Sequence, residues 1–188
     1  MVADRPRVKK WTLKEVERLL TLGGGDSFDG YELLEGDLLE KMPQNDPHWY
    51  GQVNAVDALR QAFGTERHYP AQQPIKFNQA DAPEPDVAVL TRLTPRPKPG
   101  ETLIIVEVAD SSVADNLQRK ARIYARHAVP DYWVVDVVRK RLVVHRQPHP
   151  ETEDWGQVFE VLPGESVAPL GAPEHPIAVA DLLRQGEV

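Results

Sequence analysis

The run Leu103-Ile104-Ile105-Val106-Glu107-Val108-Ala109 decides the fold, because every residue in it except one is apolar. A continuous apolar run of this length is typical of a strand with both faces covered, in the middle of a sheet. The exception is Glu107. A buried carboxylate costs several kcal/mol unless a cation or a metal ion lies beside it. The run therefore predicts a central strand that carries an acid into a chemical site.

A second acid stands in a similar position. Asp86 precedes the apolar residues Val87-Ala88-Val89-Leu90 and opens another short predicted strand. Adjacent strands lie about 4.8 Å apart, so one acid from each strand could bind the same ion. Mg²⁺ prefers oxygen ligands, usually keeps several waters, and can activate one of them for attack on a phosphodiester. The two acids therefore predict a metal site for phosphodiester hydrolysis.

A lysine would complete such a site. Lys120 stands thirteen residues after Glu107, on a predicted helix at 115–126. Close to the acids, its ammonium group could orient the attacking water or stabilise charge that develops on the phosphate. Spacing alone does not bring Lys120 to the acids, because the helix must first pack across the strand ends. The alternative is a lysine that faces solvent. Tyr124, one turn further on, would share the helix face of Lys120.

Length and composition limit the possible classes of protein. The 188 residues fit one domain, 1–188, large enough to bury about 70% of its unfolded surface. The absence of cysteine excludes disulfides and thiolate zinc sites, and it agrees with a reducing cytoplasm. No run approaches the roughly 18 apolar residues of a membrane span, and no nucleotide-binding glycine motif is present. We therefore expect a cytoplasmic protein with no membrane partner and no organic cofactor.

Charge is unevenly distributed along the chain. The net charge is −7, from 22 basic and 29 acidic residues, which by itself argues against a nucleic-acid partner. Residues 115–146, however, hold eight basic residues against three acidic ones, a net of +5, and they adjoin the candidate site. Residues 150–188 hold eight acidic residues against Arg184 alone. The basic segment could attract a phosphate backbone; the alternative is ordinary solvated charge on a helix and strands.

Local signals place the N-terminal elements. Thr12-Leu13-Lys14-Glu15 is a capping box that opens a helix reaching about Leu22, and Gly23-Gly24-Gly25 should end it. Residues 31–34 and 37–40 should form a hairpin around Glu35-Gly36. A second helix should begin with Asp46 as its cap and end at Gly64. Helical spacing predicts its core-facing side as Trp49, Val53, Val56, Leu59 and Phe63.

The remaining elements give the fold class. Further strands are predicted at 68–71, 75–77, 86–90, 102–108, 131–138, 142–145 and 158–162, with a short helix at 179–183. This order indicates an α/β protein, with a mixed α+β sheet flanked by helices. We expect a core at 12–140, to which 141–188 adds C-terminal strands and a short helix.

Several of these segments, in this order, resemble the Uma family of small bacterial proteins. They are Pro85-Asp86, the strand that carries Glu107, the pair Lys120 and Tyr124, and the segment 129–136. The hairpin at 31–38 followed by His48 is also similar to the N-terminal part of that family. The family is placed in the PD-(D/E)xK nuclease superfamily, among the restriction endonucleases. The resemblance covers about 12–140.

The resemblance implies a restriction-endonuclease-like core and a Mg²⁺-dependent endonuclease acting on DNA, with Mn²⁺ as a substitute ion and a homodimer as the assembly. Asp86 and Glu107 would be metal ligands. The parent superfamily has its lysine two residues after the second acid, where this chain has Ala109. The resemblance therefore assigns that role to Lys120. Catalytic roles would fall on Asp86, Glu107, Lys120 and, as an additional acid, Glu32, with His48 and Tyr124 as auxiliary residues.

Two other functions remain open from the sequence. The overall acidity favours a non-catalytic nucleic-acid-binding or regulatory dimer that keeps the fold, whereas the two acids and the lysine favour the enzyme. A third possibility keeps the metal and changes the substrate to RNA or a nucleotide. His145 and His149 lack a partner at metal-ligand spacing, and we interpret them as structural. Asp136 ends a predicted strand, where we expect it to face solvent or to pair with Arg139.

Overall fold

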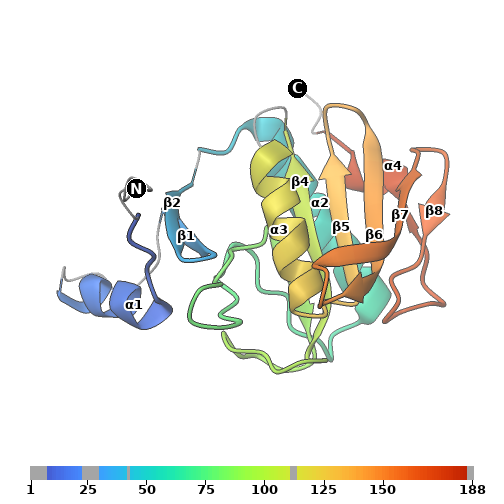
Figure 1. The fold of residues 1–188 in the computed structure, drawn as a ribbon. Helices are drawn as coiled ribbons and strands as arrows, with labels where there is room; N and C mark the ends of the chain where they lie inside the picture. Colours follow the sequence, from blue (N-terminus) through green and yellow to red (C-terminus); the bar gives the residue numbers. More distant parts are fainter. Residues whose placement is uncertain (1–7, 23–29, 42, 111–113, 186–188) are drawn as a thin grey trace, which may run out of the picture.

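The computed structural model describes residues 8–22, 30–41, 43–110 and 114–185, and its centre is a five-stranded sheet (Figure 1). The strand order is β3-β4-β5-β6-β7. Strands β4 and β5 are parallel, and every other neighbouring pair is antiparallel. The strands are β3 (Val87–Leu90), β4 (Thr102–Ala109), β5 (Asp131–Asp136), β6 (Arg141–His149) and β7 (Asp154–Val161). The predicted mixed sheet is confirmed.

Helices cover both faces of this sheet (Figure 1). Helix α2 (Asp46–Phe63) packs on one face, in a core that includes Val106, Val108 and Trp133. Helix α3 (Ala114–Arg126) connects the parallel strands β4 and β5 and packs on the other face. Strand β4 is buried along its length except at half-buried Leu103, as the apolar run predicted. Glu107 thus lies inside the sheet and beneath α3.

The N-terminal elements lie beside the sheet. The capping box forms, because the Thr12 N–H donates to the Glu15 carboxylate (2.8 Å) and the Glu15 N–H to the Thr12 hydroxyl (3.3 Å). It opens α1 (Leu13–Leu22); the glycines expected to end this helix lie outside the described residues. The predicted hairpin is β1 (Tyr31–Leu34) and β2 (Asp37–Glu40), which lies beside α3 in Figure 1.

The predicted core face of α2 is correct in the second half of the helix and wrong in the first. Leu59 is buried, and Val56 and Phe63 pack against the core. Trp49 and Val53, however, are 53% and 37% exposed, and the buried side there carries Gly51 and Ala55. A Cβ added at Gly51 would lie 2.8 Å from Val108 Cγ1, so only glycine allows this approach of α2 to β4. Periodicity of large apolar residues misses a helix face made of small ones. The cap is also one residue earlier than predicted: the Asn45 side chain, not that of Asp46, accepts the His48 N–H.

Other boundaries differ as well. The segments 68–71 and 75–77 are not strands, although His68 forms an isolated bridge to Leu90. Strand β5 stops at Asp136, whose carboxylate accepts the Arg139 N–H (2.9 Å) and so closes a turn. Near the C-terminus, β8 (Ser166–Val167) and β9 (Ile177–Ala178) pair in a separate small sheet before α4 (Val179–Leu182). None of the described helices is long and apolar enough to cross a bilayer.

Candidate active site

Strand pairing brings Asp86 and Glu107 together. Val87 lies opposite Val106 in the antiparallel ladder, so the preceding Asp86 stands opposite Glu107. Alternation along β4 turns the Glu107 side chain toward α3, and Asp86 lines the same cleft as Glu107. The ladder also fixes the first acid, because the Val108 N–H donates to Asp86 Oδ2 at 2.7 Å. Two carboxylates from neighbouring strands therefore face the same region, as the sequence predicted.

Glu107 is held by two side chains of α3. Lys120 Nζ lies 3.1 Å from its Oε1 and 3.3 Å from its Oε2, and the Tyr124 hydroxyl donates to Oε1 at 2.7 Å. All three residues are buried. The lysine and the tyrosine stand four positions apart, so one helix face presents both to the strand. The helix does pack across the strand ends, which the proposed role of Lys120 requires.

Lys120 joins the strands to the hairpin. Besides Glu107, its ammonium group contacts Glu32 Oε2 at 3.1 Å and donates to the Glu84 carbonyl oxygen at 3.1 Å. Glu32 Oε2 also accepts the Glu84 N–H at 3.2 Å. The three donors of the ammonium thus have three acceptors, on β4, on β1 and on the segment before β3. This arrangement gathers three parts of the chain around one positive charge.

Burial and charge set the pKa values of this group. Burial raises the pKa of Glu107 to about 8, and Asp86 adds to the rise, while Lys120 opposes it. Burial alone would lower the pKa of Lys120, but Glu107 and Glu32 raise it above its usual value. Lys120 therefore stays protonated near neutral pH and keeps a positive charge beside Glu107.

Asp86 has its own set of partners. His48 Nε2 lies 3.2 Å from Asp86 Oδ2. Burial lowers the pKa of His48, but the hydrogen bond and charge of Asp86, together with the charges of Asp110 and Glu107, raise it, and the net change is upward. Gln52 Nε2 donates to the Asp86 carbonyl oxygen at 3.1 Å, and Gln44 Nε2 lies 3.5 Å from Oδ1. Among the described residues, Oδ1 has no closer hydrogen-bond partner, so this oxygen faces the cleft with spare acceptor capacity.

The six residues proposed from the sequence line or border one cleft of about 390 Å³. Tyr124 lies behind Glu107, and the cleft itself is lined by Asp86, Glu107, Lys120, Glu32 and His48. Sequence reasoning missed Glu84, which is buried in the same wall and forms an ion pair with Lys41. Burial raises the pKa of Glu84. The signal was present: an acid between two prolines, two residues before Asp86.

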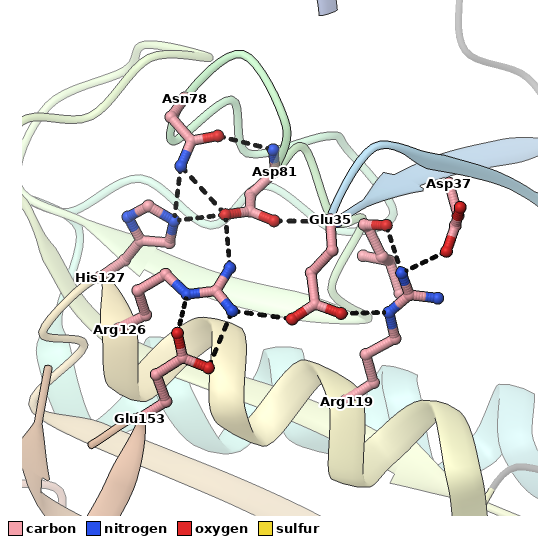
Figure 2. A network of polar contacts seen from close by, with 9 residues as sticks. Glu35, Asp37, Asn78, Asp81, Arg119, Arg126, His127 and Glu153 are labelled. Atoms are coloured by element: carbon pink, nitrogen blue, oxygen red, sulfur yellow. Dashed lines mark hydrogen bonds and ion pairs between the residues drawn. The ribbon is translucent and has the colours of Figure 1, made fainter. Parts of the chain in front are cut away.

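A polar network holds α3 against the hairpin (Figure 2). Arg119, next to Lys120, donates to Glu35 (2.9 Å), to Asp37 (2.7 Å) and to the Leu34 carbonyl oxygen (2.6 Å). The neighbouring Arg126 contacts Glu35 at 2.7 Å. These contacts therefore set how β1 and its Glu32 meet Lys120.

The second half of the network is centred on the fully buried Asp81. Its carboxylate accepts from Arg126 (3.1 Å), lies 3.0 Å from His127 Nε2, and accepts the Glu35 N–H (3.0 Å) (Figure 2). Arg126 also pairs with Glu153 at 2.8 Å. The end of α3, the hairpin turn and the loop before β3 are thereby tied to one carboxylate.

The sequence profile described as "Uma2: Putative restriction endonuclease" matches residues 16–180. The chain belongs to the Uma2 family. The resemblance found in the sequence is thus confirmed, and the description of the Uma2 family supports a nuclease. No curated protein sequence matches the chain significantly.

The fold of this Uma2 protein is shared with a solved structure. That structure, described as a putative nuclease belonging to DUF820 from Anabaena variabilis ATCC 29413, aligns with a TM-score of 0.71 at 19% sequence identity. The alignment covers 92% of this chain and 97% of the other. At that identity the likeness shows the fold alone.

The donors in the Uma2 cleft are suited to a hard divalent cation. Among the described residues, no three His, Asp or Glu side chains are grouped as a closed metal cage requires. Mg²⁺ needs no such cage, because it commonly binds through one or two carboxylates and keeps its waters. Asp86 Oδ1 and the Glu107 carboxylate offer oxygen ligands from facing strand positions. The residues present therefore fit Mg²⁺ or Mn²⁺.

Proposed function

We propose that this Uma2 protein is a Mg²⁺-dependent endonuclease that hydrolyses phosphodiester bonds in DNA. The observation that carries the proposal is the facing pair Asp86 and Glu107 in one cleft with Lys120 and Glu32. Acids placed on paired strands, with a buried cation beside them, can bind a metal ion and a phosphate together. A fold alone would not support a function, whereas this set of side chains does.

Asp86 and Glu107 would hold the ion, and Mn²⁺ could replace Mg²⁺. When bound, the ion supplies positive charge at the phosphate and lowers the pKa of a bound water. The chain keeps the two ligands in place. The Val108 N–H and His48 orient Asp86, and the Tyr124 hydroxyl orients Glu107. Ligands held in this way lose little freedom on binding, which favours both affinity and rate.

Lys120 has two tasks in this proposal. It neutralises Glu107 and Glu32, which would otherwise repel each other inside the protein. It also stands at the cleft wall, where turning one N–H toward a bound phosphate or its attacking water would stabilise developing negative charge. Glu32 would support a second water or the ion. Glu84, which lines the same wall, is an additional acid available for that purpose.

DNA is the proposed substrate, and a homodimer is the proposed assembly. Two symmetric copies would place one site at each strand of a duplex. The basic residues of 115–146 lie on α3, on β6 and in the turn before β6, and Lys120 among them lines the cleft. They could contact the phosphate backbone despite the net charge of −7.

The test is cleavage of supercoiled plasmid with Mg²⁺ or Mn²⁺. We expect nicking or linearisation by the native chain, and none by Glu107→Gln or Asp86→Asn. Glu174→Gln, on an exposed loop, is the matched control and should cleave normally. Binding of each metal ion to the same proteins is measured by calorimetric titration. Metal binding without cleavage of DNA or RNA would favour the regulatory binding protein, and cleavage that survives in both acid variants would refute the site.

A further inference from the structure

A second lysine, Lys41, lies in the wall of the candidate cleft. It directly follows β2, and its backbone N–H donates to the Gly30 carbonyl oxygen at 2.8 Å, which extends the hairpin ladder by one hydrogen bond. Its ammonium group forms an ion pair with Glu84, which is buried in the same wall. The proposed metal ligands and catalytic groups do not include Lys41, so its place in the cleft has no role yet.

The two lysines of the cleft differ in how their N–H donors are used. Lys120 has 9% of its side chain exposed, and its ammonium group already has three protein acceptors. Lys41 has 31% of its side chain exposed, and among the described residues its ammonium group contacts Glu84 alone. Because an ammonium group carries three N–H donors, two of those on Lys41 are available to a ligand. Lys41 can therefore bind an anion and keep its ion pair, whereas Lys120 must first give up a contact.

The lining of the cleft is mostly acidic. Two lysines and six acids are among the described residues that line it, the acids being Glu32, Glu40, Glu84, Asp86, Glu107 and Asp110. A metal ion would offset only part of this negative charge. A phosphate that enters the cleft therefore meets like charge, which costs several kcal/mol where it is not compensated. An accessible cation in the wall is the group that lowers this cost.

Lys41 lies close to the proposed metal ligands. Its partner Glu84 is two residues before Asp86, so the Cα atoms of these two acids are at most about 7 Å apart. Glu84 is itself held, because its N–H donates to Glu32 Oε2 at 3.2 Å and its carbonyl oxygen accepts from Lys120 at 3.1 Å. The ion pair therefore holds the end of the Lys41 side chain beside the segment that leads to Asp86.

We propose that Lys41 binds a phosphate oxygen of the substrate backbone, in the cleft where Asp86 and Glu107 hold the metal ion. A lysine ammonium binds phosphate as a compact point charge, and Glu84 positions this one. The substrate class, a nucleic acid, rests on the proposed function. The contact is made as soon as the substrate binds, so it contributes to affinity for the substrate rather than to the chemical step.

Binding of DNA to the full chain tests this contact. The anisotropy of a fluorescein-labelled duplex oligonucleotide is measured at several salt concentrations with Ca²⁺, which takes oxygen ligands as Mg²⁺ does. Lys41→Met should weaken binding about tenfold or more, as the loss of a hydrogen bond to a charged group predicts. It should also lower the slope of log affinity against log salt by about 1. Lys98→Met, the same change on the exposed loop at the other end of β3 and β4, should alter neither quantity.

A double variant separates a phosphate contact from an effect of the broken ion pair. Lys41→Met leaves Glu84 buried without its partner, which can disturb the cleft by itself. Lys41→Met with Glu84→Gln removes that unpaired charge and restores the native net charge, so only the loss of a direct contact keeps binding weak. We expect weak binding and the lowered salt slope in the double variant, which decides the question if the single variant does not fold. Lys41→Arg should bind as the native chain does, because it keeps the charge and the donors.

Failure of this contact and failure of the nuclease proposal are distinguishable, because the binding assay needs no cleavage. Native affinity and salt slope in Lys41→Met or in the double variant, or no DNA binding by the native chain, would overturn the contact. A chain that loses affinity and slope with Lys41→Met but leaves plasmid intact with Mg²⁺ and Mn²⁺ would keep the contact and lose the nuclease proposal. A chain that cuts plasmid while Lys41→Met binds DNA normally would do the reverse.

Discussion

Lys120 Nζ lies 3.1 Å from Glu107 Oε1, which connects the face of α3 to the interior of the central strand. The same ammonium contacts Glu32 of the hairpin, so one side chain neutralises acids from two separate elements. Removing one member of a buried pair leaves the other charge unpaired, which costs more than the pair itself contributes. This asymmetry makes Lys120 a structural residue as well as a proposed catalytic one.

Replacement of Lys120 by Met should therefore lower stability and activity together. We expect a loss of about 3 kcal/mol in the free energy of unfolding, measured by urea denaturation at pH 7, and loss of metal-dependent cleavage. The double variant Lys120→Met with Glu107→Gln should be more stable than the sum of the single effects, because it removes the unpaired acid. Additive losses would show that the two side chains do not interact in solution.

Tyr124 and Tyr132 are both buried, so the same substitution by phenylalanine can be compared at the two positions. The Tyr124 hydroxyl donates to Glu107 at 2.7 Å, whereas the Tyr132 hydroxyl has no partner among the described residues. Tyr124→Phe should lower the free energy of unfolding by about 1.5–3 kcal/mol, the usual value for a hydrogen bond to a charged group. Tyr132→Phe should leave it unchanged or raise it by about 1 kcal/mol. Thermal and urea unfolding of both variants checks this, and a reversed order would contradict it.

Acid should unfold the protein partly through Asp81. Burial alone would raise its pKa, but hydrogen bonds from His127, the Glu35 N–H and Asn78 lower it to about 2, against a reference of 3.8. A carboxyl whose pKa is depressed by folding stabilises the native state above its unfolded pKa and loses that contribution as pH falls. We expect the unfolding free energy to decrease between about pH 4 and pH 2.

Asp81→Asn removes this titration and should flatten that part of the pH profile. Its stability at pH 7 should be lower, because Arg126 and His127 lose a charged acceptor. Asp57→Asn, at an exposed position of α2, is the control and should keep the native slope. Equal slopes in both variants would mean that Asp81 does not titrate as its contacts predict.

Substitution of two arginines one turn apart on α3 distinguishes the effect of the ion-pair network on stability from the effect of general surface charge. Arg126 forms ion pairs with Asp81, Glu35 and Glu153, while Arg122 is exposed and has no ion pair to a described residue. Arg126→Ala should cost about 2 kcal/mol of stability and weaken metal binding, because the hairpin that carries Glu32 loses its attachment. Arg122→Ala should change stability by less than about 0.5 kcal/mol. Urea unfolding and metal titration of the two variants measure these differences, and equal effects of the two substitutions would contradict the prediction.

The sequence predicted the strand pair better than the rest of the site. Asp86 and Glu107 were recognisable because each acid interrupts or opens an apolar run, and strand periodicity then fixes the face on which they lie. Lys120 could not be placed from spacing, since its distance from Glu107 depends on how α3 crosses the sheet. The resemblance to a family supplied that assignment, and the contact at 3.1 Å agrees with it.

Two features escaped sequence reasoning for physical reasons. Glu84 lies between prolines, in a segment without strand or helix periodicity, so its burial could not be predicted from periodicity, and only its closeness to Asp86 in the sequence pointed to it. The buried face of α2 is built partly from Gly51 and Ala55, whose small side chains carry little weight in a hydrophobic pattern. Their importance comes from the closeness of helix and sheet, which only the folded chain shows.

Gly51 connects the packing of α2 on β4 to the geometry of the candidate active site. A Cβ at this position would lie 2.8 Å from Val108 Cγ1 and 3.2 Å from Val137 Cγ1. Gly51→Ala should therefore push α2 away from β4 and cost about 1–3 kcal/mol, the usual range for overpacking. Val108 follows Glu107, and its N–H holds Asp86. A displaced strand should accordingly weaken metal binding as well.

A compensating substitution distinguishes steric overlap from the intrinsic effect of alanine in a helix, which by itself favours the helix by about 0.5–1 kcal/mol. Val108→Ala removes two of the three methyl groups that Gly51→Ala would meet, those at 2.8 and 3.5 Å, and leaves Val137 Cγ1 at 3.2 Å. The double variant should recover metal affinity and most of the stability lost by Gly51→Ala, because total volume is nearly conserved. Calorimetric metal titration and urea unfolding of the four proteins in this cycle measure both effects. If the two losses simply add, then the contact between α2 and β4 does not position Asp86.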